Sequence, residues 1–320
     1  MLDKIKGGLY GVAIGDALGA TVEFMGQADI QRKYGVLKDI IGGGWLNLKA
    51  GEWTDDTEMT LAVAEGIRAD ANNPIPHIGE AFLRWRDTNP PDIGSTILTT
   101  FRVIDNYGKR LDADDWLSGS MEANQLLGGR TAGNGALMRT LPVAFAYQGE
   151  ELFENAMAIA AMTHFDSEAG LTCAAYCLAL REYMNGYFKV KGLNRAWENL
   201  QHYAKREAEA LQVQVKVVNM IESRISKPTG YTVDSLACPV NAFMDGDDFD
   251  EVIIQAVNLG GDADTIGAIA GGLAGVYYGY NNIPKRHIKK LSPAQKKRLD
   301  EAAAWLAERN NAITKGDNNV

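Results

Sequence analysis

The feature that most restricts the fold of this chain is a pair of glycine rows, in each of which a glycine recurs at every fourth residue. The rows are Gly7, Gly11, Gly15 and Gly19, and Gly267, Gly271, Gly275 and Gly279. Residues four apart lie on one face of an α-helix, so each row would leave a bare stripe along a helix. An interior glycine costs about 1 kcal/mol of helix propensity relative to alanine, and we predict that close packing of central helices compensates for it. Loops are the alternative, but the residues between the glycines are mainly good helix formers.

Helical periodicity dominates the rest of the chain. Apolar residues recur three and four positions apart in 151–163, 168–184, 196–222 and 295–309, whereas alternating β-branched runs are few. We therefore predict an all-α fold, a compact multi-helix bundle of about a dozen or more helices. No glycine/serine or proline linker marks a boundary. We expect a single domain over residues 1–320, with a polar tail over residues 315–320.

Two short acidic clusters lie far apart in the chain, each just before a long apolar stretch. They are Trp53-Thr54-Asp55-Asp56-Thr57 and Gly260-Gly261-Asp262-Ala263-Asp264-Thr265. Their candidate ligands are all oxygens, which hard cations such as Mg²⁺ and Mn²⁺ prefer, and two such half-sites can hold a pair of ions about 3.5–4 Å apart. The pattern predicts a hydrolase with two divalent cations.

Helix capping is the alternative for each cluster. Aspartate and threonine are favoured N-caps, and Asp55 followed by Glu58 resembles a capping box. The duplication favours metal binding, because a cation relieves the repulsion between adjacent carboxylates, whereas a cap needs only one acceptor. A third acidic run, residues 245–251, lacks the calcium-loop pattern. We expect a solvated loop and a helix start there.

The composition limits the class of partner and the compartment. The net charge is −9, which argues against a nucleic-acid surface because phosphate binding needs a basic patch. The cysteines, Cys173, Cys177 and Cys238, are odd in number and lack Cys-x-x-Cys spacing, so a reducing cytoplasm is expected. No apolar stretch reaches the roughly 18 residues that a membrane span requires, so we expect no membrane partner.

Several of these motifs together resemble the ADP-ribosylglycohydrolase family. The matching strings are Gly11–Gly19 through Glu23, Trp53–Thr57, Gly133-Asn134-Gly135-Ala136-Leu137-Met138-Arg139, Thr163-His164 and Gly260–Thr265. They follow the family's order and spread over nearly the whole chain. The segment Pro90-Pro91-Asp92-Ile93-Gly94 is most similar to the branch of bacterial dinitrogenase-reductase-activating glycohydrolases.

This resemblance implies an all-α fold with a dinuclear Mg²⁺ or Mn²⁺ centre. The reaction would be hydrolysis of the N-glycosidic bond between ADP-ribose and a modified protein arginine. The implied metal ligands are Thr54, Asp55, Asp56, Asp262, Asp264 and Thr265. The alternatives are hydrolysis of another ADP-ribosyl or ribosyl linkage, on serine, a nucleic-acid end or a small metabolite, and a non-catalytic ADP-ribose-binding relative.

The resemblance also assigns catalytic and substrate-binding residues. The expected catalytic residues are Glu23, Asp56 and Asp92, and the expected substrate-binding residues are Gly133, Asn134, Gly135, Met138 and His164. Glu23 would position or deprotonate the attacking water, or bridge metal and substrate, and Asp92 would pair with the guanidinium leaving group. Backbone N–H groups at 133–135 would face the diphosphate, with His164 as a further donor. On the residues alone, a glutamate such as Glu23 is most often a surface residue, Asp92 is equally a turn residue, and a capping or buried histidine is the default for His164.

Overall fold

The computed structural model of this chain describes residues 1–320 except 109–110, 205–206, 223–227 and 317–320. Its α-helices are α1 (Leu2–Gly19), α2 (Gln27–Tyr34), α3 (Asp55–Ala69), α4 (Pro74–Arg86), α5 (Ser95–Ile104), α6 (Ala113–Leu126), α7 (Leu141–Ala146), α8 (Gly149–Ala161), α9 (Ser167–Met184), α10 (Lys189–Tyr203), α11 (Glu207–Glu222), α12 (Thr232–Asp245), α13 (Phe249–Val257), α14 (Ala263–Tyr278), α15 (Lys285–Ile288) and α16 (Pro293–Gly316). Two 3₁₀ turns, η1 (Leu137–Arg139) and η2 (Tyr280–Asn282), complete the set. Within the described residues, β-pairing is limited to isolated bridges, so the predicted all-α class is confirmed.

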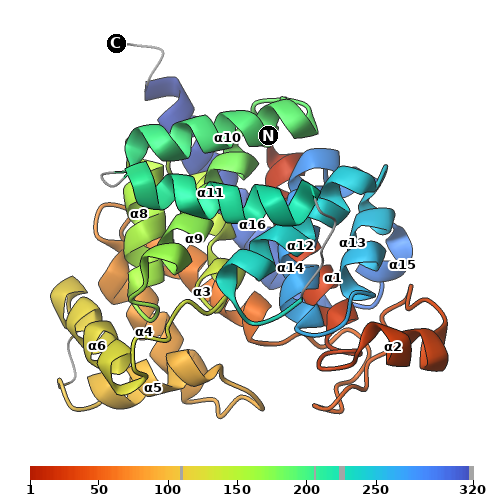
Figure 1. Cartoon of the computed structure of the whole chain (residues 1–320), viewed down its shortest axis with the longest axis horizontal. Coiled ribbons are helices and arrows are strands. Elements are labelled where there is room, and N and C mark those ends of the chain that lie inside the picture. The colour runs from red at the N-terminus through yellow and green to blue at the C-terminus, as the bar shows by residue number, and fades with distance from the viewer. Residues whose placement is uncertain (109–110, 205–206, 223–227, 317–320) are drawn as a thin grey trace.

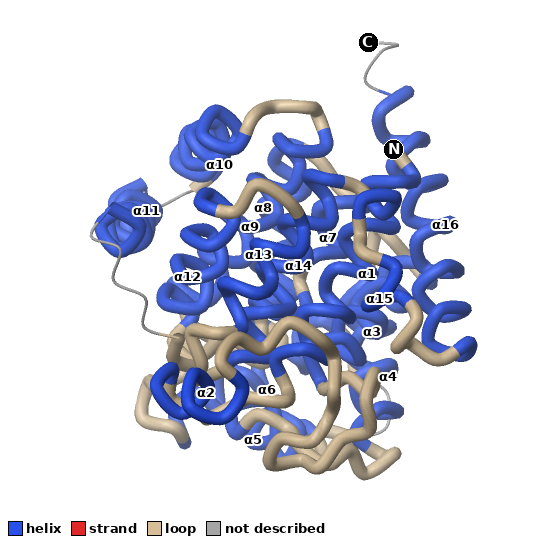
Figure 2. Tube along the Cα trace, turned by 90° about the vertical axis from the view of Figure 1, so that its right-hand side faces the viewer, coloured by secondary structure: helices blue, strands red, loops and turns tan. Residues whose placement is uncertain are grey.

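Helices α1 and α14 lie side by side in the middle of the molecule (Figures 1 and 2). Their glycine rows face each other in antiparallel order, Gly7 against Gly275, Gly11 against Gly271 and Gly15 against Gly267. A Cβ built on any of these six glycines would overlap a carbonyl oxygen of the opposite helix. The predicted close packing is therefore confirmed, because a larger residue at these positions would push the two backbones apart.

The ends of the two rows behave differently. Gly19 approaches Ala263 rather than another glycine. Gly279 lies one residue beyond α14 with a φ of +85°, where it ends the helix in a conformation that residues with a side chain rarely adopt. The second row therefore contributes a helix stop as well as a packing surface.

The other periodic stretches form helices, and one of the stretches is divided between two helices. The stretches 151–163, 168–184 and 295–309 fall on α8, α9 and α16. The stretch 196–222 is divided between α10 and α11, which cross the upper part of Figure 1. No glycine or proline occurs between residues 196 and 222, so the sequence carries no marker of this division. Helix α16 continues to Gly316, and the rest of the predicted polar tail lies outside the described residues.

The fold brings several loops to one end of the central helices. Helices α2 and α5 and the loops beside them lie in the lower part of both views (Figures 1 and 2). Since α1 and α14 are antiparallel, the end of α1 lies beside the start of α14, where Gly261 N–H donates to the Met25 carbonyl at 2.8 Å. Among the described helices, none is long and apolar enough to cross a lipid bilayer.

Candidate active site

The two acidic clusters lie at the starts of α3 and α14. Thr54 is the N-cap of α3 and Asp262 is the N-cap of α14, but neither side chain accepts a hydrogen bond from its helix backbone. Glu58, the second member of the possible capping box, instead binds Arg298 and the Trp53 indole. Neither N-cap residue therefore makes the side-chain bond that the capping alternative requires, although Asp264 Oδ1 accepts from the Thr265 N–H at 2.9 Å in the first turn of α14.

Three carboxylates from different segments meet beside the start of α14. Glu23 lies just past the end of α1, and Asp262 and Asp264 begin α14. One oxygen from each of the three lies within 4.8 Å of the others. Oxygen donors at this spacing can share a hard divalent cation. Glu23 therefore lies within a group that could hold a metal ion, where it could act on a water or bridge metal and substrate.

The first cluster adds further buried acids. Burial raises the pKa values of Asp55 and Asp56 well above the usual range of an aspartate, and the charges of neighbouring carboxylates raise both values further. The same causes act on Asp264. One oxygen of Asp56, Oδ1, is buried and has no hydrogen-bond partner. Crowded carboxylates with a free buried oxygen are the arrangement that a cation stabilises.

Asp16, which the sequence analysis did not select, holds the first cluster in place. It is fully buried in α1 and accepts hydrogen bonds from the backbone N–H groups of Thr54 and Thr57, at 2.9 and 3.1 Å. Both threonine hydroxyls also donate to it, although burial still raises the pKa of Asp16 to about 6. A lone charge in the otherwise uncharged run between Gly7 and Gly19 was the available signal.

Trp45 is a second residue that sequence reasoning missed. Its indole N–H donates to Glu23 Oε2 at 2.6 Å, and its half-exposed ring lies beside the exposed ring of Phe24. Burial and the charges of Asp262 and Asp92 raise the pKa of Glu23 to about 7, although the Trp45 hydrogen bond opposes them. Trp45 follows three glycines in a loop, and nothing in that pattern indicates contact with Glu23.

The Gly133-Asn134-Gly135 segment forms another wall of the site. The Asn134 side chain donates to Asp262 Oδ2 at 2.6 Å and to Ser235 Oγ at 2.9 Å. We expected this residue's backbone N–H to face a diphosphate. It donates instead to the Gly230 carbonyl, so it is not free to bind one. The apolar stretch that follows forms only η1, a single 3₁₀ turn, before α7. Asn134 thus orients a carboxylate of the acidic group.

His164 lies behind the two glycines of that segment. Its imidazole Nε2 would lie 3.3 Å from a Cβ on Gly133 and 3.2 Å from a Cβ on Gly135. Nδ1 lies 2.8 Å from Thr163 Oγ1. Burial, with the charge of Arg139, lowers the pKa of His164 to about 3, so the ring is neutral at physiological pH. His164 is a buried histidine with one edge directed at the site.

The site is a cavity of about 240 Å³. The predicted residues that line it are Glu23, Asp55, Asp56, Asp92, Gly133, Asn134, Gly135, Met138, His164, Asp262, Asp264 and Thr265. Thr54 is the one predicted residue that is not among its lining residues. It is buried, and its hydroxyl lies within hydrogen-bond distance of Asp16 and Asp56 instead.

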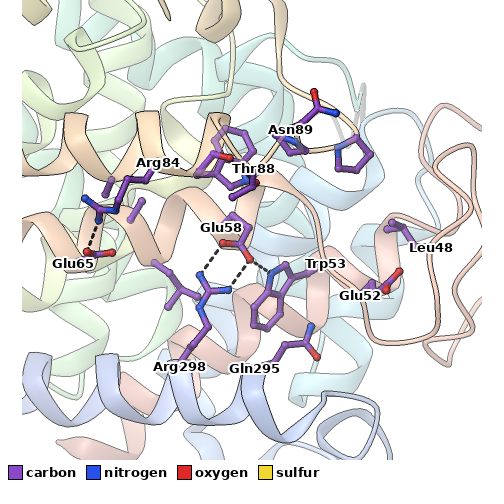
Figure 3. A pocket seen from close by; sticks show the side chains of 16 residues that line it. Leu48, Glu52, Trp53, Glu58, Glu65, Arg84, Thr88, Asn89, Gln295 and Arg298 are labelled. Carbon is purple, nitrogen blue, oxygen red and sulfur yellow. Dashed lines mark hydrogen bonds and ion pairs between the residues drawn. The ribbon is translucent and has the colours of Figure 1, made fainter. Parts of the chain in front are cut away.

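A larger cavity, of about 760 Å³, is lined in part by Trp53 and by the loop before Asp92. Figure 3 shows two of its carboxylates paired, Glu58 with Arg298 and Glu65 with Arg84, while Glu52 lies apart from these pairs. Paired carboxylates have no need of a cation. The smaller cavity, with its crowded acids, is therefore the better candidate for chemistry.

The remaining sequence features lie away from this site. Asp248 caps α13 by accepting from the Glu251 N–H, which confirms a helix start in the third acidic run. Cys173, Cys177 and Cys238 are buried and unbridged.

Comparison with known proteins identifies similar chains. The ADP-ribosylglycohydrolase family model matches residues 1–315. The chain is 37% identical over 291 residues to ADP-ribosyl-[dinitrogen reductase] glycohydrolase of Rhodospirillum rubrum, covering 90% of each chain. It is 32% identical over 319 residues to ADP-ribosylarginine hydrolase Tri1 of Serratia proteamaculans, covering 95% of this chain and 79% of the relative. A solved structure titled ADP-ribosylglycohydrolase-related protein complex matches with a TM-score of 0.79 and 30% identity, covering 97% of this chain and 98% of the other.

Proposed function

Because this chain belongs to the ADP-ribosylglycohydrolase family, we propose that it hydrolyses the N-glycosidic bond between ADP-ribose and a modified protein arginine, releasing ADP-ribose. The observation that carries the proposal is the single cavity in which the acids of two helix starts meet Asp92. Two relatives named as ADP-ribosylarginine hydrolases support the arginine linkage. The match over residues 1–315 supports a single domain.

The residues of the site fit a pair of Mg²⁺ or Mn²⁺ ions. The donors are oxygens, three carboxylates approach within 4.8 Å, and Asp56 Oδ1 is buried without a partner. We propose that the ions are held by Thr54, Asp55, Asp56, Asp262, Asp264 and Thr265. Such ions would offset the crowded negative charge, orient the ribose hydroxyls and lower the pKa of a nearby water.

Glu23 is the proposed general base. It lines the cavity beside Asp262 and Asp264, and a carboxylate within reach of a bound water can take its proton as the water oxygen attacks. The Trp45 N–H holds one carboxylate oxygen, Oε2. The other oxygen can then face a water that attacks the anomeric carbon.

Asp92 is the proposed partner of the guanidinium leaving group. It is half-buried in the cavity wall, and its charge is close enough to raise the pKa of both Glu23 and Asp55. A carboxylate can bind a guanidinium through two parallel hydrogen bonds and keep it protonated as it departs. Gly133, Gly135, Met138 and His164 would bind the rest of ADP-ribose.

The proposed partner is an ADP-ribosylated protein, as in the names of the relatives. The buried, unbridged cysteines support a reducing compartment, which we propose to be the cytoplasm.

Release of ADP-ribose from arginine-, serine- and DNA-linked substrates, each with Mg²⁺, Mn²⁺ or EDTA, tests the proposal. We expect metal-dependent release from the arginine-linked substrate and much slower release from the other two. Release that is faster from serine or DNA contradicts the arginine assignment, and full activity in EDTA contradicts the metal assignment.

A further inference from the structure

A fully buried arginine lies behind the candidate site, and no carboxylate of the described residues is hydrogen-bonded to it. Arg139, the last residue of η1, has no exposed surface, and its guanidinium lies 4.5 Å from the centre of the Phe82 ring. Its Nη2 donates to Thr163 Oγ1 at 2.8 Å and to the Ile159 carbonyl at 3.3 Å. A guanidinium can only donate hydrogen bonds. The Thr163 oxygen is therefore the acceptor.

This bond determines the role of the Thr163 hydroxyl hydrogen. Thr163 is fully buried, and its oxygen also lies 2.8 Å from His164 Nδ1. Among the described residues, these two side chains are the hydrogen-bond partners of this hydroxyl. Since Arg139 already supplies a donor, the hydroxyl hydrogen can be satisfied only if it points at Nδ1 and Nδ1 accepts it.

The opposite arrangement leaves a polar group unsatisfied. If Nδ1 carried the proton, the Thr163 oxygen would accept from both Arg139 and His164, and its own hydrogen would face a buried environment without an acceptor. A buried donor without an acceptor carries a desolvation penalty. The neutral imidazole therefore holds its single proton on Nε2.

The Nε2 edge is the one that faces the site. It lies against Gly133 and Gly135, neither of which has a side chain to cover it. An Nε2–H presents a donor to an anionic oxygen, whereas a bare Nε2 would present a lone pair and repel it.

We propose that Arg139 and Thr163 are positioning residues that hold His164 in the Nε2–H tautomer, so that it offers one neutral donor to an anionic oxygen in the cavity. The identity of that oxygen, a phosphate oxygen of ADP-ribose, rests on the proposed function. The tautomer itself does not.

Nitrogen-15 NMR of the full chain with labelled histidine tests the tautomer directly, because protonated and unprotonated ring nitrogens resonate far apart. Loss of signals in His164→Gln identifies His164. We expect a protonated Nε2 and an unprotonated Nδ1 in the wild type and in Thr163→Ser. Thr163→Val should shift both nitrogens toward a mixture of tautomers.

His287 provides an internal control. Its Nε2 lies 2.8 Å from Asp250 Oδ1, away from Thr163, so its signals should not change in either variant. A protonated Nδ1 of His164 in the wild type overturns the proposal, and that result needs no variant to fold. Unchanged His164 shifts in a folded Thr163→Val protein also overturn it.

Binding of ADP-ribose measures the consequence. We expect the Kd to rise roughly tenfold in Thr163→Val, because a hydrogen bond to a charged acceptor is weakened, and to stay near the wild-type value in Thr163→Ser. An equal Kd in all three proteins contradicts the positioning role. If the NMR result is as expected but no ADP-ribosyl substrate is cleaved, the proposed function fails and the tautomer assignment remains.

Discussion

Asp16 Oδ1 accepts a hydrogen bond from the backbone N–H of Thr54 at 2.9 Å, and this bond ties the last turn of α1 to the residue that precedes α3. The contact joins positions 38 residues apart. Because Asp55 and Asp56 follow Thr54 directly, the position of the first acidic cluster depends on a side chain of the central helix.

The first prediction concerns this bond. Asp16→Asn replaces one accepting oxygen with an amide NH₂ group, which donates. This group would then face the N–H groups and hydroxyls of Thr54 and Thr57, which also donate. We expect a loss of about 1–3 kcal/mol in the free energy of unfolding, and a loss of hydrolysis larger than that destabilisation explains. Urea unfolding and initial rates measure the two effects. Asp3→Asn, at the other end of α1, should preserve activity, and equal behaviour of the two variants contradicts a role for Asp16 in the site.

The second prediction concerns the central glycines. Gly11→Ala would place a Cβ in overlap with the Gly271 carbonyl oxygen. We expect destabilisation of about 1–3 kcal/mol or more, because neither backbone can move without disturbing the other contacts of the row. Gly26→Ala is the control, since its Cβ would meet only Asp29 Oδ2 at 3.5 Å. Equal melting temperatures for the two variants would show that the row tolerates separation of the helices.

The third prediction separates metal binding from helix capping. A cation at a hundredfold its Kd stabilises a folded protein by about 2.7 kcal/mol, so Mg²⁺ or Mn²⁺ should raise the melting temperature of the wild type. Asp264→Asn should abolish this increase in melting temperature, because it removes a ligand. It should not lower the stability in EDTA, because it also removes one negative charge from a crowded group of carboxylates. Asp248→Ala removes the α13 cap and should cost about 1 kcal/mol with or without metal. An intact metal response in Asp264→Asn rules this residue out as a ligand.

The fourth prediction concerns arginine specificity. Asp92→Asn keeps the size of the side chain but removes the charge that would pair with a guanidinium. We expect the rate on arginine-linked substrate to fall about ten- to a hundredfold, while the Kd for ADP-ribose changes little. Asp87→Asn, on the same loop but paired with Arg86 at the surface, is the control. A wild-type rate for Asp92→Asn would leave Asp92 as a turn residue.

The fifth prediction concerns pH and the larger cavity. Burial opposes ionisation of Glu58, but hydrogen bonds from Arg298 and Trp53 outweigh it and lower the pKa of Glu58 below its ordinary value. The stabilisation from this ion pair is therefore fully present above the pKa of Glu58 in the unfolded chain, about 4.3. It is lost as the pH falls through the lower pKa of Glu58 in the folded protein. Because the Arg298 side chain is 46% exposed, we expect Glu58→Gln to cost about 1 kcal/mol at pH 7.

Urea unfolding at pH 7 and pH 3 measures this difference, which should shrink at pH 3. A difference that grows at pH 3 contradicts the sign of the pKa shift. Hydrolysis by Glu58→Gln should match the wild type at pH 7, since Glu58 does not line the candidate site.

Local sequence determined the helical class, the central packing and the acids of the site. Helical periodicity and the energetic cost of glycine act within a few residues, so they can be read without knowing the fold. The two glycine rows predicted close packing of central helices, and the two aspartate clusters indicated half-sites that the structure places around one cavity. Every predicted site residue except Thr54 lines that cavity.

Only the tertiary structure decided which distant side chains support those acids. Asp16 is recognisable as unusual, but its contact with Thr54 exists because α1 packs beside the start of α3. The Trp45 bond to Glu23 and the Arg139 bond to Thr163 likewise join residues 22 and 24 positions apart through the path of the intervening chain. Such contacts depend on how helices pack, and a local pattern carries no record of that geometry. The same reason explains why the division between α10 and α11, which no glycine or proline marks, could not be predicted.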